Sequence, residues 1–365
     1  MIAVAALTTG KDTPSARFRA RQLIPALNHR GVDVTELVPR LCPFAPNPLS
    51  SVLSTSRRTK RVSDALWTGV KAVSRFGDVY DCRQFDVVWL LKGLLPGLMT
   101  FESLIKPPLV LDVDDAIWLQ HKFSKRAVPA LARQADLVVV GNSWLAEHFE
   151  RWSKEVVIVP TGVDTSRFVP GLGQENRRLT IGWTGTSSNL RYLYEIESAL
   201  GRFIHDTGAM LLVLCDRPPQ FKALPADNVR FVPWNDREEV EHIQSMDIGI
   251  MPLGREEWSY GKCALKLLTY LACGIPVVAT PISANHEVLN SADVGFGAAN
   301  ELEWYDALKL LGSDAELRES MGSAGRKLVE TDYSIEAVAP IYAALFARFV
   351  LESPAWNPSR VSNKS

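Results

Sequence analysis

The chain has 365 residues, a formal net charge of −1 and 22% charged residues, a composition typical of a globular protein with two domains. The near-zero charge argues against binding to nucleic acid, and no apolar run approaches the roughly 20 residues that a membrane-spanning helix needs. Five scattered cysteines without zinc-ligand spacing, and a first segment that is typical of a strand rather than a signal peptide, indicate a reduced, cytoplasmic protein.

Residues 2–7 predict a buried strand, and a loop with Gly10 leads from it into a helix that Ser15 could cap. Arg17 lies in the first turn of that helix. In α/β folds such a loop lies at the carboxyl edge of the sheet, where ligands bind, so Gly10 and Arg17 are candidate ligand contacts. A solvated helix start explains the same residues equally well. A second strand is expected at 32–38.

Residues 57–75 predict a basic amphipathic helix. Its apolar face consists of Val62, Leu66, Val70 and Val73, at helical spacing. Its basic residues, opposed by the single acid Asp64, are Arg57, Arg58, Lys60, Arg61, Lys71 and Arg75. Such a helix either packs its apolar face inward, which is the slightly favoured interpretation, or lies on an anionic membrane. The second interpretation predicts a peripheral contact between this segment and the inner face of the membrane.

Buried strands are also expected at 86–93 and 109–115, and the second of these ends in Asp112, Asp114 and Asp115. An Asp-x-Asp pair after a strand, here Asp112 and Asp114, could hold Mg²⁺ or Mn²⁺ against a diphosphate. Short motifs of this kind are frequent by chance. The alternative is that Asp114 or Asp115 faces an acceptor molecule as a base or as a group that positions a hydroxyl.

The second half of the chain is expected to contain buried strands at 179–183, 210–216, 228–234 and 247–253. Gly185, Thr186 and Ser187 follow the first of these strands and precede a predicted helix. Small residues and hydroxyl groups at a helix N-terminus form a cradle suited to a phosphate group. This loop is therefore a candidate phosphate contact.

Residues 260–286, YGKCALKLLTYLACGIPVVATPISANH, predict a helix, a tight turn and a buried strand. Gly274 is expected to end the helix in a left-handed conformation. Lys262 and Lys266 lie one turn apart at the start of the helix, where a cation is disfavoured by roughly 0.3–1 kcal/mol unless an anion binds there. Because Gly261 would let an anion approach the backbone closely, the pattern predicts a phosphate site around the two lysines.

Two stretches resemble a known family: VVIVPTGVDTSRFVP at 156–170 and ALKLLTYLACGIPVVAT at 264–280. They are similar to motifs of the retaining glycosyltransferases of family four, and most similar to a subgroup with Lys-Cys-x-x-Lys-Leu. The resemblance implies the GT-B fold, an α/β architecture of two Rossmann-like, doubly wound domains that face each other across a cleft. The implied parts are an acceptor-binding domain at 1–172, a nucleotide-sugar-binding domain at 173–335, a helix at 336–352 that returns to the first domain, and a loose tail at 353–365.

The resemblance also implies a reaction. A sugar would move from a nucleoside-diphosphate sugar to a hydroxyl of a saccharide or lipid-linked acceptor, with retention and without a metal, in cell-surface polysaccharide or glycolipid synthesis. No cofactor beyond the donor substrate is implied. The expected catalytic residues are Lys266, Asp114, Asp115 and Arg17. Trp234 and Asn235 are expected near the base, although Trp234 could also be a core residue. The other expected donor contacts are Gly10, Gly185, Thr186, Ser187, Gly261, Lys262, Lys266 and Thr269.

The chain departs from the family at two positions. The resembled enzymes carry two glutamates eight positions apart, one near the donor sugar and one at the ribose, and Gly261 and Thr269 stand in their places here. The missing carboxylates keep two alternatives open. One is a protein that binds a nucleotide sugar without catalysis, and the other is a metal-dependent transferase that uses Asp112 and Asp114.

Overall fold

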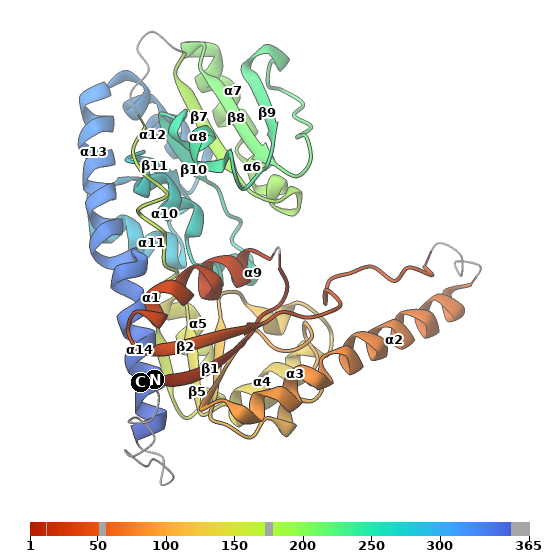
Figure 1. The fold of residues 1–365 in the computed structure, drawn as a ribbon. Coiled ribbons are helices and arrows are strands. Elements are labelled where there is room, and N and C mark those ends of the chain that lie inside the picture. The colour runs from red at the N-terminus through yellow and green to blue at the C-terminus, as the bar shows by residue number, and fades with distance from the viewer. Residues whose placement is uncertain (12, 51–55, 172–177, 352–365) are drawn as a thin grey trace. The chain divides into compact units, whose positions relative to one another are not determined.

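The computed structural model describes residues 1–11, 13–50, 56–171 and 178–351, which form two compact units. Unit 1 comprises the residues up to Pro160 together with those from Val338 on, and unit 2 comprises Thr161–Ala337 (Figure 1). The chain thus leaves unit 1 at Pro160, before the boundary expected at 172. The tail expected at 353–365 lies outside the described residues.

Unit 1 is built on a parallel sheet with the strand order β2-β1-β3-β4-β5-β6. Its strands are β1 (Ile2–Leu7), β2 (Val32–Leu37), β3 (Val87–Leu91), β4 (Leu109–Val113), β5 (Leu137–Val140) and β6 (Val156–Ile158). Every residue of β3, β4 and β5 is buried, as expected for apolar strands covered on both faces. Because β1 pairs with both β2 and β3, the strand order reverses beside β1, and such a point is where α/β sheets bind ligands.

Unit 2 repeats this plan with the order β12-β11-β10-β7-β8-β9, again all parallel. Its strands are β7 (Thr180–Thr184), β8 (Met210–Cys215), β9 (Val229–Pro233), β10 (Ile248–Met251), β11 (Val277–Ala279) and β12 (Gly295–Gly297). The order reverses between β7 and β10, which places the second ligand-binding edge after these two strands. The predicted α/β class, with two doubly wound units, is confirmed.

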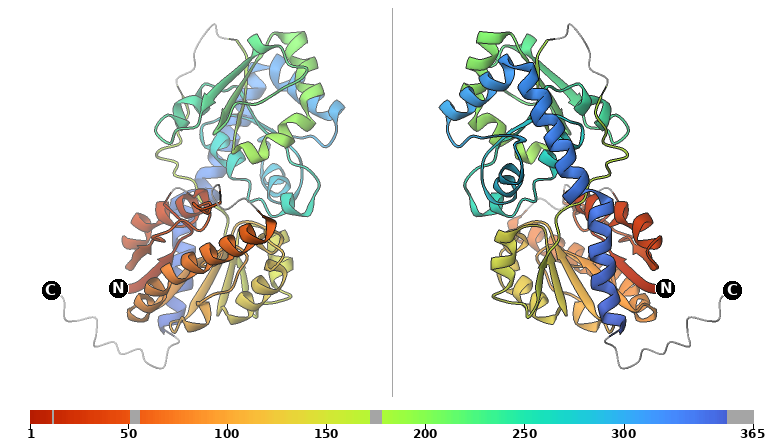
Figure 2. Two further views of the ribbon diagram at one scale, coloured as in Figure 1. Left: turned by 90° about the vertical axis from the view of Figure 1, so that its right-hand side faces the viewer. Right: turned by 90° about the vertical axis from the view of Figure 1, so that its left-hand side faces the viewer.

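Helices lie on both sides of each sheet (Figures 1 and 2). Those of unit 1 are α1 (Ile24–Asn28), α2 (Arg57–Ser74), α3 (Phe76–Asp81), α4 (Ser124–Gln134) and α5 (Ser143–Phe149). Those of unit 2 are α6 (Leu190–Glu195), α7 (Glu197–Thr207), α8 (Glu239–Gln244), α9 (Glu257–Tyr260), α10 (Leu265–Ala272), α11 (Ser283–Ser291), α12 (Glu301–Ser313) and α13 (Ala315–Leu328). The last helix, α14 (Ile335–Leu351), runs from unit 2 into unit 1. No helix in the described ranges is long and apolar enough to cross a bilayer.

A buried polar network fixes α14 within unit 1. Asp112 of β4 is 1% exposed and forms an ion pair with Arg19, 2.8 Å from nitrogen to oxygen. Tyr342 of α14 donates to Oδ2 of Asp112 at 2.5 Å, and Trp89 of β3 donates to the same atom at 3.0 Å. Arg19 also donates to the carbonyl of Val159 at 2.7 Å. Because every partner is itself buried, the network joins the sheet of unit 1, the helical segment Ala16–Ala20 and α14 in one core.

Several local expectations need correction. Ser15 is not an N-cap, since it already has helical backbone angles and its hydroxyl bonds to Asp114. Gly261 does not open α10: it ends α9, and α10 begins at Leu265 after Ala264 in a left-handed conformation (φ +53°). Gly274, with φ +71°, ends α10 as predicted.

The expected packing of α2 is wrong in two respects. Arg75, predicted on the polar outer side, is fully buried, and its guanidinium pairs with Asp78 at 2.8 Å. The predicted apolar face is exposed instead of packed, with Leu66 at 68% and Val73 at 66% exposure.

Candidate functional site

Lys262 and Lys266, the two lysines of the stretch 260–286, lie at the carboxyl edge of the unit 2 sheet. Lys266 is in the first turn of α10, and its ammonium lies 4.3 Å from the centroid of the Trp183 ring at the end of β7. A Cβ atom at Gly185 would lie 2.5 Å from Nζ of Lys266, so the glycine leaves the space that this ammonium occupies. Lys262 precedes α10 and lies over the ring of Trp258 at 4.9 Å. Lys266 thus lies beside β7, next to the reversal in strand order, and Lys262 is close enough to repel it.

Lys266 is electrostatically unusual. Burial of its ammonium lowers the pKa of Lys266 to about 7, and repulsion by Lys262 acts in the same direction. Within the described ranges no carboxylate lies within ion-pair distance of Lys266 to offset that burial. An anion bound at Nζ would supply the missing charge and raise the pKa again. The site therefore has electrostatics that favour binding of an anion.

The Gly185–Ser187 loop is placed beside Lys266 as expected, but its hydrogen-bond donors are engaged elsewhere. The N–H of Gly185 continues the sheet by donating to Leu214, at 3.0 Å. Ser187 donates its N–H and its hydroxyl to Asp216, at 2.5 and 2.9 Å. Burial alone would raise the pKa of Asp216, but these hydrogen bonds outweigh it and lower the pKa. Asp216 thus occupies the donors of Ser187, one residue of the predicted phosphate cradle.

Thr186, Asn235 and Thr269 also make internal contacts. The hydroxyl of Thr186 bonds to that of Ser188 at 2.9 Å. The hydroxyl of Thr269, which is 3% exposed, donates to the carbonyl of Lys266 at 2.9 Å, so its proton is bonded within its own helix. The side chain of Asn235 accepts from the N–H of Arg237 at 3.0 Å.

Trp234 is not a core residue. Its side chain is 43% exposed after β9, and its indole N–H donates to Glu239 at 3.1 Å. An exposed indole with its polar atom fixed by a carboxylate presents a flat face that could stack on a planar ring. The position at the carboxyl edge of the sheet is compatible with the predicted contact to a base.

A polar network that the sequence did not predict follows β10. Glu256 accepts from Tyr192 and, at 2.6 Å, from Arg191, while Ser259 donates to the hydroxyl of Tyr192 at 3.0 Å. Burial alone would raise the pKa of Glu256, but the hydrogen bond from Tyr192 and the charge of Arg191 lower it. The network joins α6 to the loop that leads to α9. It holds Glu256 as a charged acceptor at the same sheet edge as Lys266.

A second cluster lies at the carboxyl edge of the unit 1 sheet. The ammonium of Lys92, directly after β3, lies 2.8 Å from Asp114 and 2.6 Å from Asp115, which follow β4. Ser15 donates to the other oxygen of Asp114 at 2.7 Å. Burial alone would lower the pKa of Lys92, but the charges of the two aspartates and their hydrogen bonds raise it well above its ordinary value. The three side chains are 12–17% exposed, so the cluster reaches the surface.

The backbone at this cluster is strained. Lys92 has φ +62°, in the left-handed region that a lysine rarely adopts, and Gly93 follows with φ +131°. Strain of this kind concentrates at functional sites, where the surroundings hold it in place. The ammonium of Lys92 lies within ion-pair distance of both carboxylates, an arrangement that suits hydrogen-bond acceptors for a hydroxyl.

The remaining unit 1 predictions have mixed outcomes. The prediction that Asp112 and Asp114 could hold a metal is wrong, because Asp112 is buried and both of its oxygens bond to Arg19, Trp89 and Tyr342. Gly10 is buried in the loop after β1 with φ +153°, and its carbonyl accepts from Thr13 at 3.2 Å. Arg17 is half-buried over the ring of Phe18, at 4.5 Å, and it is Arg19 that makes the buried ion pair.

Comparisons with known proteins show which family and which folds the chain is similar to. Residues 178–314 match the family model described as Glycosyl transferases group 1. The chain is 25% identical over 274 residues to D-inositol 3-phosphate glycosyltransferase from Corynebacterium jeikeium. The aligned residues cover 65% of this chain and 64% of that protein. The chain spans less than two thirds of the length of the two curated relatives it matches: 64% of this one and 42% of the other.

Two solved structures share the architecture across nearly the whole chain. Sucrose-phosphate synthase from Thermosynechococcus elongatus matches with a TM-score of 0.69 at 15% identity, covering 97% of this chain and all of that one. HepE from Anabaena, solved with UDP and glucose, matches with a TM-score of 0.67 at 11% identity, covering 95% of this chain and all of that one. The chain therefore has the two-unit GT-B fold of these proteins and carries a match to the glycosyl transferases group 1 in residues 178–314.

Proposed function

We propose that the protein is a glycosyltransferase that moves a sugar from a nucleoside-diphosphate sugar to an acceptor hydroxyl with retention and without a metal. The observation that carries the proposal is the position of Lys266, a lysine without a carboxylate partner in the described ranges, beside Gly185 at the strand-order reversal of unit 2. A diphosphate is the anion that suits this position, because it gains negative charge as its bond to the sugar breaks. The match of residues 178–314 and the UDP in the HepE structure support a nucleotide-sugar donor.

Each expected residue has a role in this proposal. Lys266 and Lys262 stabilise the leaving diphosphate, and the exposed face of Trp234, with Asn235 beside it, lies against the base. Gly185 keeps space for the Lys266 ammonium, and Thr186 and Ser187 contribute when the donor displaces Asp216 from the loop. Gly261, which ends α9, and Thr269, whose hydroxyl donates to the carbonyl of Lys266, adjoin the two lysines at the same site.

Unit 1 holds the acceptor in this proposal. Asp114 and Asp115, both paired with Lys92, accept hydrogen bonds from the hydroxyl of a saccharide or lipid-linked acceptor. Arg17 and the Gly10 loop lie after β1, beside the reversal in strand order, and contribute to the same edge. Cell-surface polysaccharide or glycolipid synthesis is the process in which such acceptors occur. The five free thiols support a cytoplasmic location.

A test of the proposal measures product as well as binding. The full chain is incubated in EDTA with UDP-, GDP-, ADP- and dTDP-hexoses and a panel of saccharide and lipid-linked acceptors. We expect nucleoside diphosphate release that requires an acceptor, and a product whose anomeric proton coupling in NMR matches that of the donor. Inverted product, or transfer only with added Mg²⁺, would contradict retention or metal independence.

One observation favours a second function, binding of a nucleotide sugar without catalysis. Gly261 and Thr269 replace the two glutamates that the resembled enzymes carry, and Thr269 is turned into its own helix. This alternative predicts tight binding of one nucleotide sugar with no diphosphate release for any acceptor. The same experiment therefore separates the two functions.

A further inference from the structure

Helix α2 presents an apolar stripe to solvent. Val62, Leu66, Val70 and Val73 lie at helical spacing, and their side chains are 55%, 68%, 49% and 66% exposed. The helix extends away from the unit 1 sheet with its first turn outermost (Figure 1). Eight of the nineteen large apolar side chains exposed in the described ranges lie between Phe44 and Tyr80, about a tenth of the chain. Single exposed apolar residues are ordinary, but a concentration of this kind marks an interaction surface.

Hydrogen bonds determine which side of α2 faces outward. Trp67 donates its indole N–H to the carbonyl of Ala45 at 3.2 Å, and Lys71 donates to the carbonyl of Pro43 at 2.7 Å. Asn47 donates to Ser63 and Asp64, at 2.8 and 2.9 Å. The polar side of the helix is thus bonded to the segment before it. Residues 42–50 and α2 together form one structure, here called the arm, whose apolar stripe cannot turn inward without breaking these bonds.

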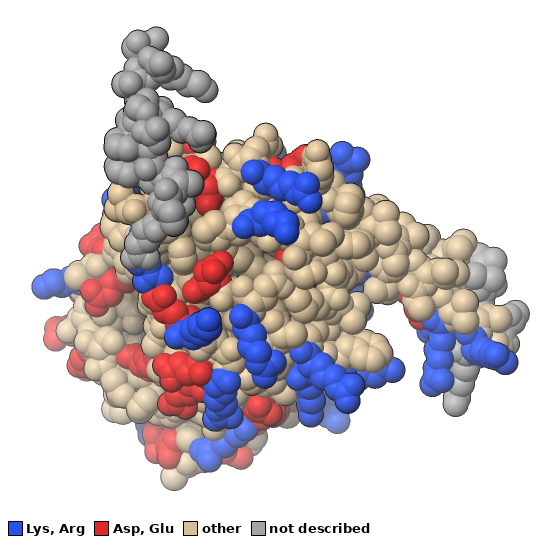
Figure 3. Space-filling view, turned by 90° about the horizontal axis from the view of Figure 1, so that it is seen from below, with Lys and Arg blue, Asp and Glu red and all other residues tan. Residues whose placement is uncertain are grey.

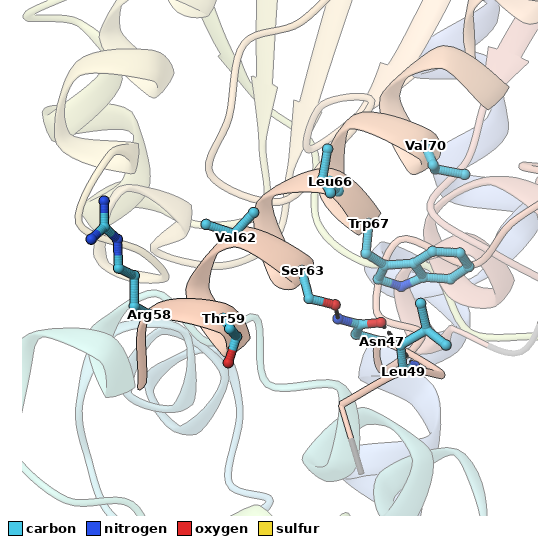
Figure 4. A pocket seen from close by; sticks show the side chains of 9 residues that line it. All are labelled: Asn47, Leu49, Arg58, Thr59, Val62, Ser63, Leu66, Trp67 and Val70. Carbon is cyan, nitrogen blue, oxygen red and sulfur yellow. Dashed lines mark hydrogen bonds between the residues drawn. The ribbon is translucent and has the colours of Figure 1, made fainter. Parts of the chain in front are cut away.

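The arm also carries a shallow groove of about 500 Å³ (Figure 4). It is lined by Asn47, Leu49, Arg58, Thr59, Val62, Ser63, Leu66, Trp67 and Val70. Leu49 is 53% exposed, and Phe44, on the same segment, is 55% exposed. The groove is therefore continuous with the stripe and extends its apolar surface onto residues 42–50.

Positive charge adjoins the stripe. Helix α2 contains five basic residues and one acid, which is a net charge of +4 over residues 57–74. Arg58, Lys60 and Arg61 are exposed in its first two turns, and Figure 3 shows Lys and Arg side chains gathered at the outer end of the arm. Basic residues in a first helical turn are disfavoured by the helix dipole, so a negative surface close to them would stabilise the helix.

We propose that the arm docks unit 1 onto an anionic phospholipid surface, with α2 lying in the interface. The stripe from Val62 to Val73 is roughly 17 Å long at 1.5 Å per residue, which suits a helix lying along a membrane. Its valine and leucine side chains enter the acyl boundary, while Arg58, Lys60 and Arg61 meet lipid phosphates.

Charge and apolar surface together favour lipid over the other occupants of the stripe. A second copy of the chain would bring two α2 helices of net charge +4 against each other. Residues 352–365 carry Glu352, Arg360 and Lys364, a net charge of +1, and are not complementary to α2 either. A nucleic acid would match the charge but not the aliphatic stripe. An anionic lipid surface matches both.

The test is co-sedimentation of the full chain with vesicles of phosphatidylcholine alone and of phosphatidylcholine with 30% phosphatidylglycerol. We expect at least tenfold more binding to the anionic vesicles, and loss of that binding in Leu66→Glu and in Arg61→Glu. The matched controls are Leu302→Glu and Lys327→Glu, which make the same changes at exposed positions of unit 2. Thermal melts confirm that each variant is folded.

Hydrogen exchange with and without the anionic vesicles locates the contact. Slower exchange confined to residues 57–74 supports the proposal. Equal binding to neutral vesicles, undiminished binding of Leu66→Glu, or protection elsewhere in the chain overturns it. Self-association of the native chain that Leu66→Glu abolishes, without vesicle binding, would overturn it in favour of a dimer.

Discussion

The Cβ position that Gly185 lacks lies 2.5 Å from Nζ of Lys266, so the glycine on one side of the site is what admits the ammonium on the other. The same position lies 2.7 Å from the Trp183 ring, which cannot move freely because Trp183 is fully buried. Binding of a ligand at Lys266 therefore depends on Gly185, because a methyl group at that position would occupy the space of the ammonium.

Gly185→Ala should weaken nucleoside-diphosphate binding by at least about tenfold, because the added methyl displaces the Lys266 ammonium. Isothermal titration calorimetry measures the affinity. Gly201→Ala is the matched control, since a Cβ there meets its nearest atom at 3.4 Å and alanine favours the helix. Equal affinities of the two variants would show that Gly185 does not position Lys266.

Nucleotide affinity should fall as pH rises above 7. The pKa of Lys266 is about 7 in the free protein, and a bound diphosphate favours the charged lysine, so binding above pH 7 takes up a proton. The affinity should then fall by up to about tenfold per pH unit until the pKa of the complex is reached. Lys266→Met should abolish this slope, and Lys262→Met should retain it. An identical slope in all three proteins would assign the titration to another group.

Lys266→Met should make the ligand-free protein more stable at pH 7. The folded state lowers the pKa of Lys266 below the ordinary value of 10.5, so between pH 7 and 10.5 the unfolded chain binds a proton that the folded protein lacks. Stability of the native protein therefore rises with pH across that window. The methionine variant should melt a few degrees higher than the native protein at pH 7, and the gain should shrink toward pH 10. A variant that melts lower at pH 7 would contradict the burial of an unpaired charge.

Lys92→Met should impair transfer without affecting nucleotide binding, because it leaves Asp114 and Asp115 without their shared counter-charge in unit 1. We expect the transfer rate to fall by about ten- to a hundredfold while the nucleotide affinity stays unchanged. The comparison variant is Lys122→Met, at an exposed lysine of the same unit. Equal loss of nucleotide binding would mean that the substitution disturbs more than the acceptor edge.

Arg19→Met should destabilise the protein by about 3–5 kcal/mol, the typical cost of removing one partner from a buried ion pair. Replacing both partners, in Arg19→Met with Asp112→Leu, should restore part of that loss, because no unpaired charge remains but the buried donors of Tyr342 and Trp89 lose their acceptor. Urea unfolding followed by tryptophan fluorescence gives the transition midpoints. A double variant as unstable as Arg19→Met alone would show that packing, rather than charge, dominates there.

Local signals in the sequence predicted the α/β class, and the resemblance at 156–170 and 264–280 implied the two-unit GT-B architecture. The apolar runs at 2–7, 109–115 and 277–279 became strands, and Gly274 ended its helix with a positive φ. The strand-turn order then required parallel sheets with ligands at their carboxyl edges. Helix boundaries were less well predicted, since Ala264 adopts a left-handed conformation that its residue type does not indicate.

The site could be predicted only in part. The pairing of Lys92 with Asp114 and Asp115, and the capture of Ser187 by Asp216, join residues that are 22 to 29 positions apart and have no motif of their own. Asp112 was a plausible ligand by spacing, but β4 is buried along its whole length and Asp112 pairs with Arg19 there. The apolar residues of α2 have the spacing of a packed helix, so the sequence does not show that they are exposed. The hydrogen bonds to residues 43–47 determine which side of the helix faces outward.

The most direct test of the account is calorimetric titration of UDP, GDP, ADP and dTDP, in EDTA, into the native protein, Lys266→Ala and the control Lys309→Ala. The account predicts that at least one nucleotide binds the native and control proteins and binds Lys266→Ala at least about tenfold more weakly. If no nucleotide binds, or if Lys266→Ala binds as tightly as the native protein, the diphosphate site at Lys266 is contradicted.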